Sequence, residues 1–141
     1  MSVHGEFSLP LRVYIEDTDA GGIVYYVNYL KFIERARTEY MRSLGFGKDY
    51  IFNHDLMFVV RNVALNYRAP ARLDDELRAT ALISELGGAS MTMHQKVYRG
   101  DEVLVEGDVG LACVNREGVR PRRLPADMLA VLKEAAGVGR D

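Results

Sequence analysis

The stretch from Arg12 to Arg42 constrains this chain most, because it joins a short strand, a polar turn with two glycines and a long helix without a spacer. In the turn, Gly21 and Gly22 permit positive φ angles and let another chemical group approach the main chain closely. A helical pattern begins at Asn28, a residue type that is favoured at the N-cap. The free N–H groups of the first helical turn, at the positive end of the helix dipole, are therefore expected to face a ligand beside the glycines.

The predicted helix from Asn28 to Leu44 carries one apolar arc with a charged exception. At about 100° per residue, the arc contains Tyr29, Ile33, Ala36, Tyr40 and Leu44, with Leu30 and Met41 beside it. Gly45 and Gly47 end the helix. Arg37 falls inside the arc and needs a partner, which leaves two interpretations open. It snorkels or pairs with Glu34 or another acid, or it orders the glycine turn.

Five strands are expected around this helix. The first covers Phe7 to Glu16, and Pro10 indicates that it lies at a sheet edge. The other four, with hairpin turns at Gly87-Gly88 and Gly100-Asp101, cover Met57–Arg68, Glu76–Leu86, Ser90–Arg99 and Val103–Val114. Asp49–Asp55 is expected to be a loop and Ala126–Ala136 a short terminal helix. This order is typical of an α+β fold, with the long helix on one face of an antiparallel sheet.

Composition narrows the class of protein. The chain has 141 residues, 48% of them hydrophobic, so residues 1–141 are expected to form a single domain. A net charge of −2, with the 18 basic residues spread along the chain, argues against a nucleic-acid partner. The lone Cys113 cannot form an internal disulfide, and neither a signal segment nor an apolar run of about 18 residues is present. We therefore expect a cytoplasmic protein without membrane insertion.

The turn offers a carboxylate beside oriented backbone donors, which is the minimum needed to hydrolyse an acyl group. Asp19 could activate the attack while N–H groups hold the developing oxyanion; an ordinary turn or cap role is the alternative for this residue. Asp17 and Asp19 could also share a metal ion, but such sites recruit more oxygen ligands. Because His4, His54 and His94 are scattered, no metal site is expected.

These residues resemble the hotdog-fold acyl-CoA thioesterases of the 4-hydroxybenzoyl-CoA thioesterase family, and within it the Tol-Pal-associated branch. The resemblance covers about Leu11 to Pro125 and rests on residues 12–14 (Arg-Val-Tyr), 16–25 (Glu-Asp-Thr-Asp-Ala-Gly-Gly-Ile-Val-Tyr), 28–29 (Asn-Tyr), 34–39 (Glu-Arg-Ala-Arg-Thr-Glu) and 72–75 (Arg-Leu-Asp-Asp). One position departs from the branch, which commonly has a histidine where this chain has Tyr26; tyrosine there is more like the 4-hydroxybenzoyl-CoA enzyme.

The resemblance implies a hotdog fold, in which a five-stranded antiparallel sheet wraps one long helix. It also implies a homo-oligomer, a dimer or tetramer with active sites at the dimer interface, that hydrolyses acyl-CoA to a free acid and coenzyme A. Asp19 would be the catalytic carboxylate, acting as nucleophile or as general base. The thioester carbonyl would lie against the N–H of Tyr26 at the helix start, with Gly22 and Asn28 close by. No cofactor is required.

Coenzyme A carries several phosphate charges, so a chain of net charge −2 needs local arginines to bind it. The C-terminal cluster Arg120, Arg122 and Arg123 is the favoured candidate, because arginine forms forked, charge-assisted hydrogen bonds with phosphate. Arg61 and Arg68 on the second strand, or a cluster that is merely a solvated loop, are the alternatives.

Three strand methionines, Met57, Met91 and Met93, are expected to fill core or acyl-pocket space, and His94 is expected to be a satisfied wall histidine. Two other functions stay open. Some relatives hold the nucleotide phosphates with a basic run after the third strand, where this chain has Gly87-Gly88-Ala89. Because of that difference, hydrolysis of acyl groups from acyl carrier protein stays an alternative function. A non-catalytic acyl-binding or scaffolding partner of envelope proteins is the third possibility, and the presence of Asp19 argues against it.

Overall fold

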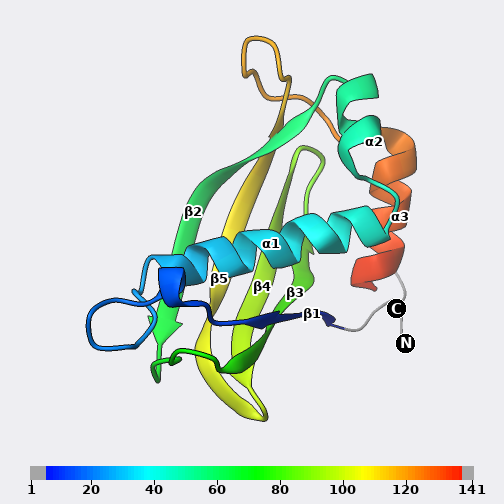
Figure 1. The fold of residues 1–141 in the computed structure, drawn as a ribbon. Helices are drawn as coiled ribbons and strands as arrows, with labels where there is room; N and C mark the ends of the chain where they lie inside the picture. The colour runs from blue at the N-terminus through cyan, green and yellow to red at the C-terminus, as the bar shows by residue number, and fades with distance from the viewer. Residues whose placement is uncertain (1–5, 138–141) are drawn as a thin grey trace.

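A computed structural model describes residues 6–137 of the chain as one antiparallel sheet with a long helix across it (Figure 1). The strands are β1 (Phe7–Arg12), β2 (Met57–Tyr67), β3 (Glu76–Leu86), β4 (Ser90–Arg99) and β5 (Glu102–Val114). The helices are α1 (Asn28–Ser43), α2 (Lys48–Asn53) and α3 (Ala126–Ala136), with a short 3₁₀ turn, η1, at Ile15–Asp17. The expected α+β class and the five-stranded antiparallel sheet are confirmed.

The sheet has the strand order β1-β3-β4-β5-β2, so β1 and β2 form its two edges. The hairpins β3–β4 and β4–β5 turn at the two glycine-containing turns, as expected, and β1 is an edge strand that contains Pro10. In the β2–β5 pairing the register shifts between Val60 and Asn62. The two strands also approach closely, since a Cβ on Gly107 would come within 2.0 Å of the Ala64 carbonyl oxygen.

The core lies between α1 and one face of the sheet. On β4 the alternation that pleated strands impose buries Met91, Met93, Gln95 and Val97 and leaves their neighbours partly exposed. On α1 the buried apolar side chains are Tyr29, Phe32, Ile33, Ala36, Tyr40 and Met41. Burying each large apolar side chain stabilises the fold by about 1.5–3 kcal/mol. Tertiary packing thus fixes α1 across the sheet, with its start and its end at opposite sides of the molecule (Figure 1).

Two predictions about the secondary structure were wrong by more than one residue. The first strand ends at Arg12, not Glu16, because the carboxylate of Asp17 accepts a hydrogen bond from the N–H of Tyr14 and closes the chain into η1. Residues Asp49–Asp55 are largely helical rather than a loop. The ring of Tyr50 packs against Phe46, with ring centroids 4.8 Å apart. Its hydroxyl also donates to the carboxylate of Asp127, so tertiary contacts stabilise a short helix that local propensity does not predict.

Candidate active site

Asp17 is buried and ties together the strand end, the turn and the start of α1. Its Oδ2 accepts from the N–H of Tyr14 at 2.9 Å, and its main-chain carbonyl accepts from the N–H of Tyr25 at 3.1 Å. The same carbonyl accepts from Nδ2 of Asn28 at 2.8 Å. The hydroxyl of Thr18 donates to the carbonyl of Ile15. Asp17 therefore shapes the turn rather than facing solvent.

Asp19 is exposed at the tip of the turn, and one of its carboxylate oxygens is engaged. Oδ1 accepts from the N–H of Gly21 at 2.8 Å, and the N–H of Gly22 donates to the Asp19 carbonyl at 3.0 Å. Within residues 6–137, Oδ2 has no hydrogen-bond donor. Gly22 has a φ of +78°, which favours glycine, and nothing lies within 4 Å of where its Cβ would stand. The main chain beside Asp19 is therefore open to an approaching group.

The start of α1 differs from the expected cap. Val27 occupies the N-cap position and Asn28 is the first helical residue, without a side-chain cap. The N-cap prediction for Asn28 was wrong because its amide is committed to the carbonyl of Asp17. In the described part of the chain, the N–H groups of Tyr26 and Val27 have no acceptor. The N–H groups of Asn28, Tyr29 and Leu30 donate to the carbonyls three residues earlier. The free donors therefore lie just before the first helical turn and not within it, as the sequence had suggested.

The segment between β2 and β3 is hydrogen-bonded to the glycine turn from its outer side. The N–H of Leu73 donates to the carbonyl of Gly22 at 3.1 Å, and the N–H of Val24 donates to the carbonyl of Ala71 at 2.8 Å. Burial raises the pKa of Asp75, but hydrogen bonds from Arg99 and from the N–H of Arg72 outweigh it and hold that pKa below its ordinary value. The charges at residues 72–75 thus act as turn and pairing groups.

An open hollow of about 270 Å³ lies beside the helix start. Its lining residues are Ile23, Val24, Tyr26, Tyr29, Tyr67, Arg68, Ala69 and Pro70. The hydroxyl of Tyr29 accepts from the N–H of Ala71 at 2.8 Å, so this tyrosine anchors the segment between β2 and β3 to α1. The ring of Tyr26 is 58% exposed. An aromatic wall therefore stands directly beside the free N–H groups.

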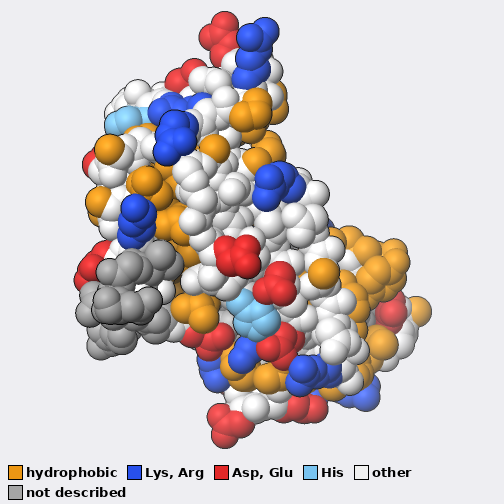
Figure 2. All heavy atoms as spheres, turned by 180° about the vertical axis from the view of Figure 1, so that it is seen from behind, with side chains coloured by type: hydrophobic (Ala, Val, Ile, Leu, Met, Phe, Trp, Pro, Cys, Tyr) orange, Lys and Arg blue, Asp and Glu red, His pale blue; other side chains and the backbone are white. Residues whose placement is uncertain are grey.

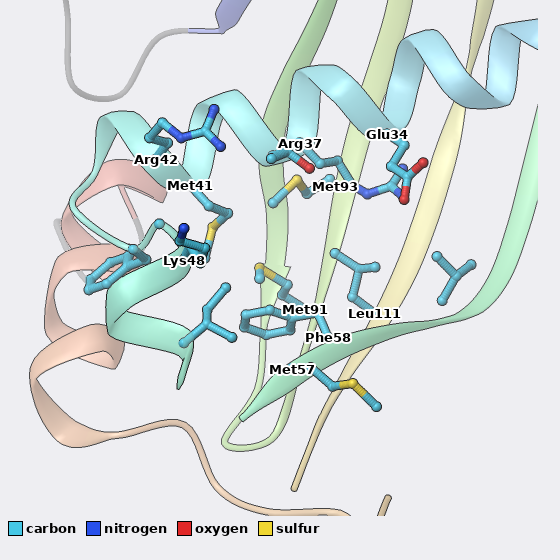
Figure 3. Close-up of a pocket in the computed structure, with 15 residues that line it drawn as sticks. Glu34, Arg37, Met41, Arg42, Lys48, Met57, Phe58, Met91, Met93 and Leu111 are labelled. Atoms are coloured by element: carbon cyan, nitrogen blue, oxygen red, sulfur yellow. The ribbon is translucent and has the colours of Figure 1, made fainter. Parts of the chain in front are cut away.

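A larger cavity of about 350 Å³ lies toward the other end of α1 (Figure 3). Met57, Met91 and Met93 line it together with Met41, Phe58 and Leu111. The residues of α1 in its wall begin at Glu34 and reach Arg42. At 1.5 Å per residue, Glu34 lies about 9 Å along the helix from Asn28 and Arg42 about 21 Å. Within one protomer, the cavity and Asp19 are thus at opposite ends of α1.

The C-terminal arginines are also at the α2 end of the molecule, and most of them have protein partners. Arg122 donates from Nη1 to the carbonyl of His54, at the end of α2. The guanidinium of Arg116 lies over the ring of Phe52, 4.1 Å from its centroid. The guanidinium of Arg123 lies against the β3–β4 turn, where a Cβ on Gly88 would come within 2.9 Å of it. The structure does not bring Arg120, Arg122 or Arg123 near Asp19 of the same protomer.

His94 lies on the sheet face that points away from α1, where acidic side chains gather beside a histidine (Figure 2). Its Nδ1 and Nε2 contact Asp108 and Glu106, each at 2.8 Å. The hydrogen bond with Asp108 raises the pKa of His94, burial opposes that effect and Glu106 adds to it. His94 is thus a satisfied wall histidine, as expected. Among the described residues no His, Cys, Asp and Glu side chains form a group that could hold a metal; His4 lies outside them.

Gln95 is a residue that the sequence interpretation missed. It is buried, and it supplies the partner that Arg37 needs: Nη1 of Arg37 donates to Oε1 of Gln95 at 3.1 Å. A signal was available, because Gln95 is the only polar residue among the inward positions Met91, Met93, Gln95 and Val97 of β4. The expected pairing of Arg37 with an acid is replaced by a neutral amide, although Glu34 acts on it through charge.

Across residues 6–137, no helix combines the length and the apolar character that crossing a bilayer requires. The model of the thioesterase superfamily matches residues 21–106 of the chain. A Haemophilus influenzae protein named acyl-CoA thioesterase YbgC is 42% identical over 125 residues, covering 88% of this chain and 92% of its own length. An Escherichia coli O6:H1 protein named acyl-CoA thioester hydrolase YbgC is 40% identical over 129 residues, covering 91% and 96%.

Among solved structures, a probable thioesterase from Bartonella henselae is 38% identical and superposes with a TM-score of 0.82, covering 86% of this chain and 100% of that one. The hotdog fold expected from the motifs is thereby confirmed. The shared name of the two curated relatives is consistent with the Tol-Pal-associated branch. The matched residues include Gly21, Gly22, α1, β2, β3, β4 and the beginning of β5, and the chain belongs to the thioesterase superfamily.

Proposed function

We propose that this protein hydrolyses acyl-CoA thioesters to a free acid and coenzyme A, with Asp19 as the catalytic carboxylate. One observation carries the proposal: an exposed carboxylate with one unengaged oxygen and the free N–H of Tyr26 belong to a single clamped turn. The two acyl-CoA thioesterases to which the chain is 40% and 42% identical support the choice of substrate. Among the described residues, no group of His, Cys, Asp and Glu side chains beside this turn could hold a metal.

In the proposed reaction, the N–H of Tyr26 binds the thioester carbonyl oxygen and stabilises the negative charge that develops on it. Preorganised donors of this kind contribute roughly 3 kcal/mol to the rate. The free oxygen of Asp19 then takes one of two roles. It attacks the carbonyl carbon and forms an anhydride that water hydrolyses, or it removes a proton from water that attacks directly. Either way the C–S bond breaks, the thiolate of coenzyme A takes up a proton, and water supplies the new acid oxygen.

Gly22 and Asn28 support this chemistry by position. Because the space beside Gly22 is empty, a thioester can approach the turn without meeting a side chain. Asn28 holds the carbonyl of Asp17, and so fixes the distance between the turn and the first N–H groups of α1. Substrate-positioning residues act in this way without touching the reacting atoms.

The unpaired edge of β2 supports a dimer. This edge strand exposes the large apolar side chains Val60, Val63 and Tyr67, and such an edge invites pairing with another strand. We place a second copy of the chain there, with the two β2 strands antiparallel about a twofold axis. Tyr67 contacts Tyr29 at the start of α1, with ring centroids 5.6 Å apart, whereas Met57 lines the cavity at the other end. Antiparallel pairing therefore brings the catalytic turn of one protomer to the cavity of the other.

This arrangement also accounts for the position of the arginines. Arg120 and Arg123 lie at the α2 end, so they reach the coenzyme A phosphates of a substrate bound at the turn of the second protomer. A tetramer made of two such dimers is compatible with the same site. We further propose that residues 1–141 act as one domain and that the protein works in the cytoplasm, where a lone cysteine such as Cys113 stays reduced.

The test is a panel of acyl-CoA thioesters from acetyl to long-chain and aromatic, with release of the free thiol as the signal. Hydrolysis of at least part of the panel by the purified protein is the expected result. A folded protein that binds acyl-CoA but releases no thiol would instead favour the non-catalytic acyl-binding interpretation. Thiol release from acyl-acyl carrier protein, but from no acyl-CoA, would favour the carrier-protein alternative.

A further inference from the structure

The larger cavity has a mainly apolar wall that contains several adaptable side chains. It lies under the C-terminal half of α1, between that helix, α2 and the inner face of β2, β4 and β5 (Figure 3). Four methionines line it: Met41, Met57, Met91 and Met93. Thioether side chains fit irregular shapes, and a volume of about 350 Å³ is at the lower end for small-molecule pockets. A short acyl group fits this description.

Arg37 is one of four charged residues in this wall. Its guanidinium extends beneath α1 above Met93 and Leu111 and toward Glu34 (Figure 3). Gln95 fixes one end of it, because both N–H groups of the Gln95 amide are already used, donating to the carbonyls of Ile33 and Thr80 at 3.0 Å each. Only Oε1 of Gln95 is left, and it accepts from Arg37 at 3.1 Å.

The guanidinium has more donors than the protein uses. It carries five N–H groups, and in the described residues only the hydrogen bond to Gln95 engages it. Burial lowers the pKa of Arg37, and the charge of Glu34 partly offsets that effect. A partly buried cation with unpaired donors is unfavourable unless another group satisfies it. A ligand that carries an oxygen acceptor and enters the cavity would supply such a group, because Arg37 lines the cavity.

The charge of the cavity wall favours an anionic acceptor. Arg37, Arg42 and Lys48 line it with Glu34 as the one acid. Arg42 is bonded to Glu39, but the remaining wall charges still sum to a positive value. Arginine pairs with a carboxylate through two parallel hydrogen bonds, which no hydrocarbon tail can replace.

We propose that Arg37 is a specificity-determining residue that binds a terminal carboxylate on the acyl group, so that the preferred substrates are CoA thioesters of short dicarboxylic acids. This inference rests on the proposed function, because the cavity of one protomer receives the acyl group held at Asp19 of the other. The carboxylate bonds to the free edge of the guanidinium, and the chain of methylene groups contacts the methionines. The thioester end lies at the turn, where water adds as described above.

The experiment compares acyl-CoA pairs of equal carbon number: succinyl with butyryl, glutaryl with pentanoyl, and adipoyl with hexanoyl. In the wild type, kcat/KM is expected to favour the dicarboxylic member of the pair whose length fits. Arg37→Met should reduce that preference by roughly 10- to 100-fold, the range for a hydrogen bond to a charged group, while changing hydrolysis of the hydrocarbon member little. Arg35→Met is the matched control, since Arg35 is exposed on α1 and outside the cavity, and it should keep the preference.

A purely structural role for Arg37 gives a different pattern. If Arg37 serves only to hold Gln95, then Arg37→Met lowers kcat/KM equally for both members of each pair, and an unchanged ratio overturns the inference. Arg37→Lys provides the test should the methionine variant not fold, because lysine keeps the charge without the forked geometry, and a partial loss of preference is expected.

A turnover-independent measurement separates this inference from the hydrolysis proposal. Succinate, glutarate and adipate should raise the Tm of the wild type more than butyrate, pentanoate and hexanoate do, and Arg37→Met should abolish the difference. Equal Tm shifts for the dicarboxylates and the monocarboxylates in the wild type overturn the inference even when hydrolysis is established. A carboxylate-dependent shift in a protein that hydrolyses no thioester keeps the binding site and removes the proposed function instead.

Discussion

The side-chain amide of Asn28 donates to the main-chain carbonyl of Asp17 at 2.8 Å, across eleven residues of sequence. This bond joins the first residue of α1 to the start of the glycine turn and so holds the helix against the turn. Replacing Asn28 by alanine should lower the free energy of unfolding by about 1 kcal/mol and kcat by roughly 10- to 100-fold. Urea unfolding and thiol release measure the two effects. Asn53→Ala, at an exposed asparagine of α2, is the control and should change neither.

Replacing Asp19 by asparagine should reduce kcat by roughly 10²- to 10⁴-fold, because the amide can neither attack a thioester nor accept a proton from water. The fold should persist, since Asp19 is exposed and its main contact is a local turn. Asp17→Asn is the matched comparison and should reduce activity less, with a larger loss of stability from its buried position. Near-normal turnover in folded Asp19→Asn would contradict the mechanism.

A lysine at Val63 should separate the protomers. Val63 is an exposed apolar residue near the middle of the β2 edge, and a charge there disfavours pairing with another strand. Light scattering should then report the mass of one chain, 15.8 kDa, and turnover should fall with it because each proposed site uses two protomers. Val131→Lys, on the exposed side of α3, should leave mass and activity unchanged. A wild-type protein that is monomeric at all concentrations and fully active would contradict the shared site.

Binding of coenzyme A should depend on Arg120 and Arg123. Arg122 is left intact, because its bond to the carbonyl of His54 holds the end of α2. Its loss would add a structural effect to any effect on binding. The double change to glutamine should raise KM for acyl-CoA, most at low salt, with little change in kcat, since phosphate contacts bind ground and transition states alike. Arg78→Gln, at an arginine stacked on Tyr98, is the control. An unchanged KM, with acyl-pantetheine hydrolysed as well as acyl-CoA, would favour the carrier-protein alternative.

The pH dependence of stability should carry a contribution from His94. Its pKa is raised in the folded state by Asp108 and Glu106, so the folded protein binds this proton more tightly than the unfolded chain does. The stabilisation is therefore complete below the unfolded value of about 6.5 and is lost as the pH rises through the folded-state pKa. His94→Gln should flatten the free energy of unfolding in that range, and His54→Gln, at the exposed histidine that follows α2, is the comparison variant. Lys96 and Arg68 also contact Glu106.

The sequence was most informative where one residue type has few alternatives. Two adjacent glycines after Asp19, and a helical period from Asn28 onward, predicted the turn and α1 almost to the residue. The hairpin turns were equally clear because glycine marks them directly. The fold could therefore be predicted in nearly all its elements, with the family resemblance supplying the way the sheet and helix enclose a core.

The parts that were missed depend on contacts between distant residues. Nothing near Lys48–Asn53 indicates that Tyr50 will find Asp127, 77 positions later, and so the short α2 could not be foreseen. The partner of Arg37 is 58 positions away and neutral, whereas charge alone suggested an acid. The arginine cluster was expected to bind the phosphates of coenzyme A, and the sequence could not show that α1 would separate it from Asp19 within one chain. The roles of Asp19, Gly22 and Tyr26 stay predictions, now with a geometry that supports them.

The amide of Gln95 bonds at once to a carbonyl of α1, a carbonyl of β3 and a side chain of α1. A helix held in this way cannot slide along the sheet, because a shift of even one residue would leave a buried amide without its partners. Both ends of α1 are therefore at fixed places: the turn that precedes it and the methionine-lined chamber beneath its far half. In the proposed dimer, the distance from the turn of one protomer to the chamber of the other is then fixed by the position of the two α1 helices. That fixed distance sets the length of acyl chain that the site accepts.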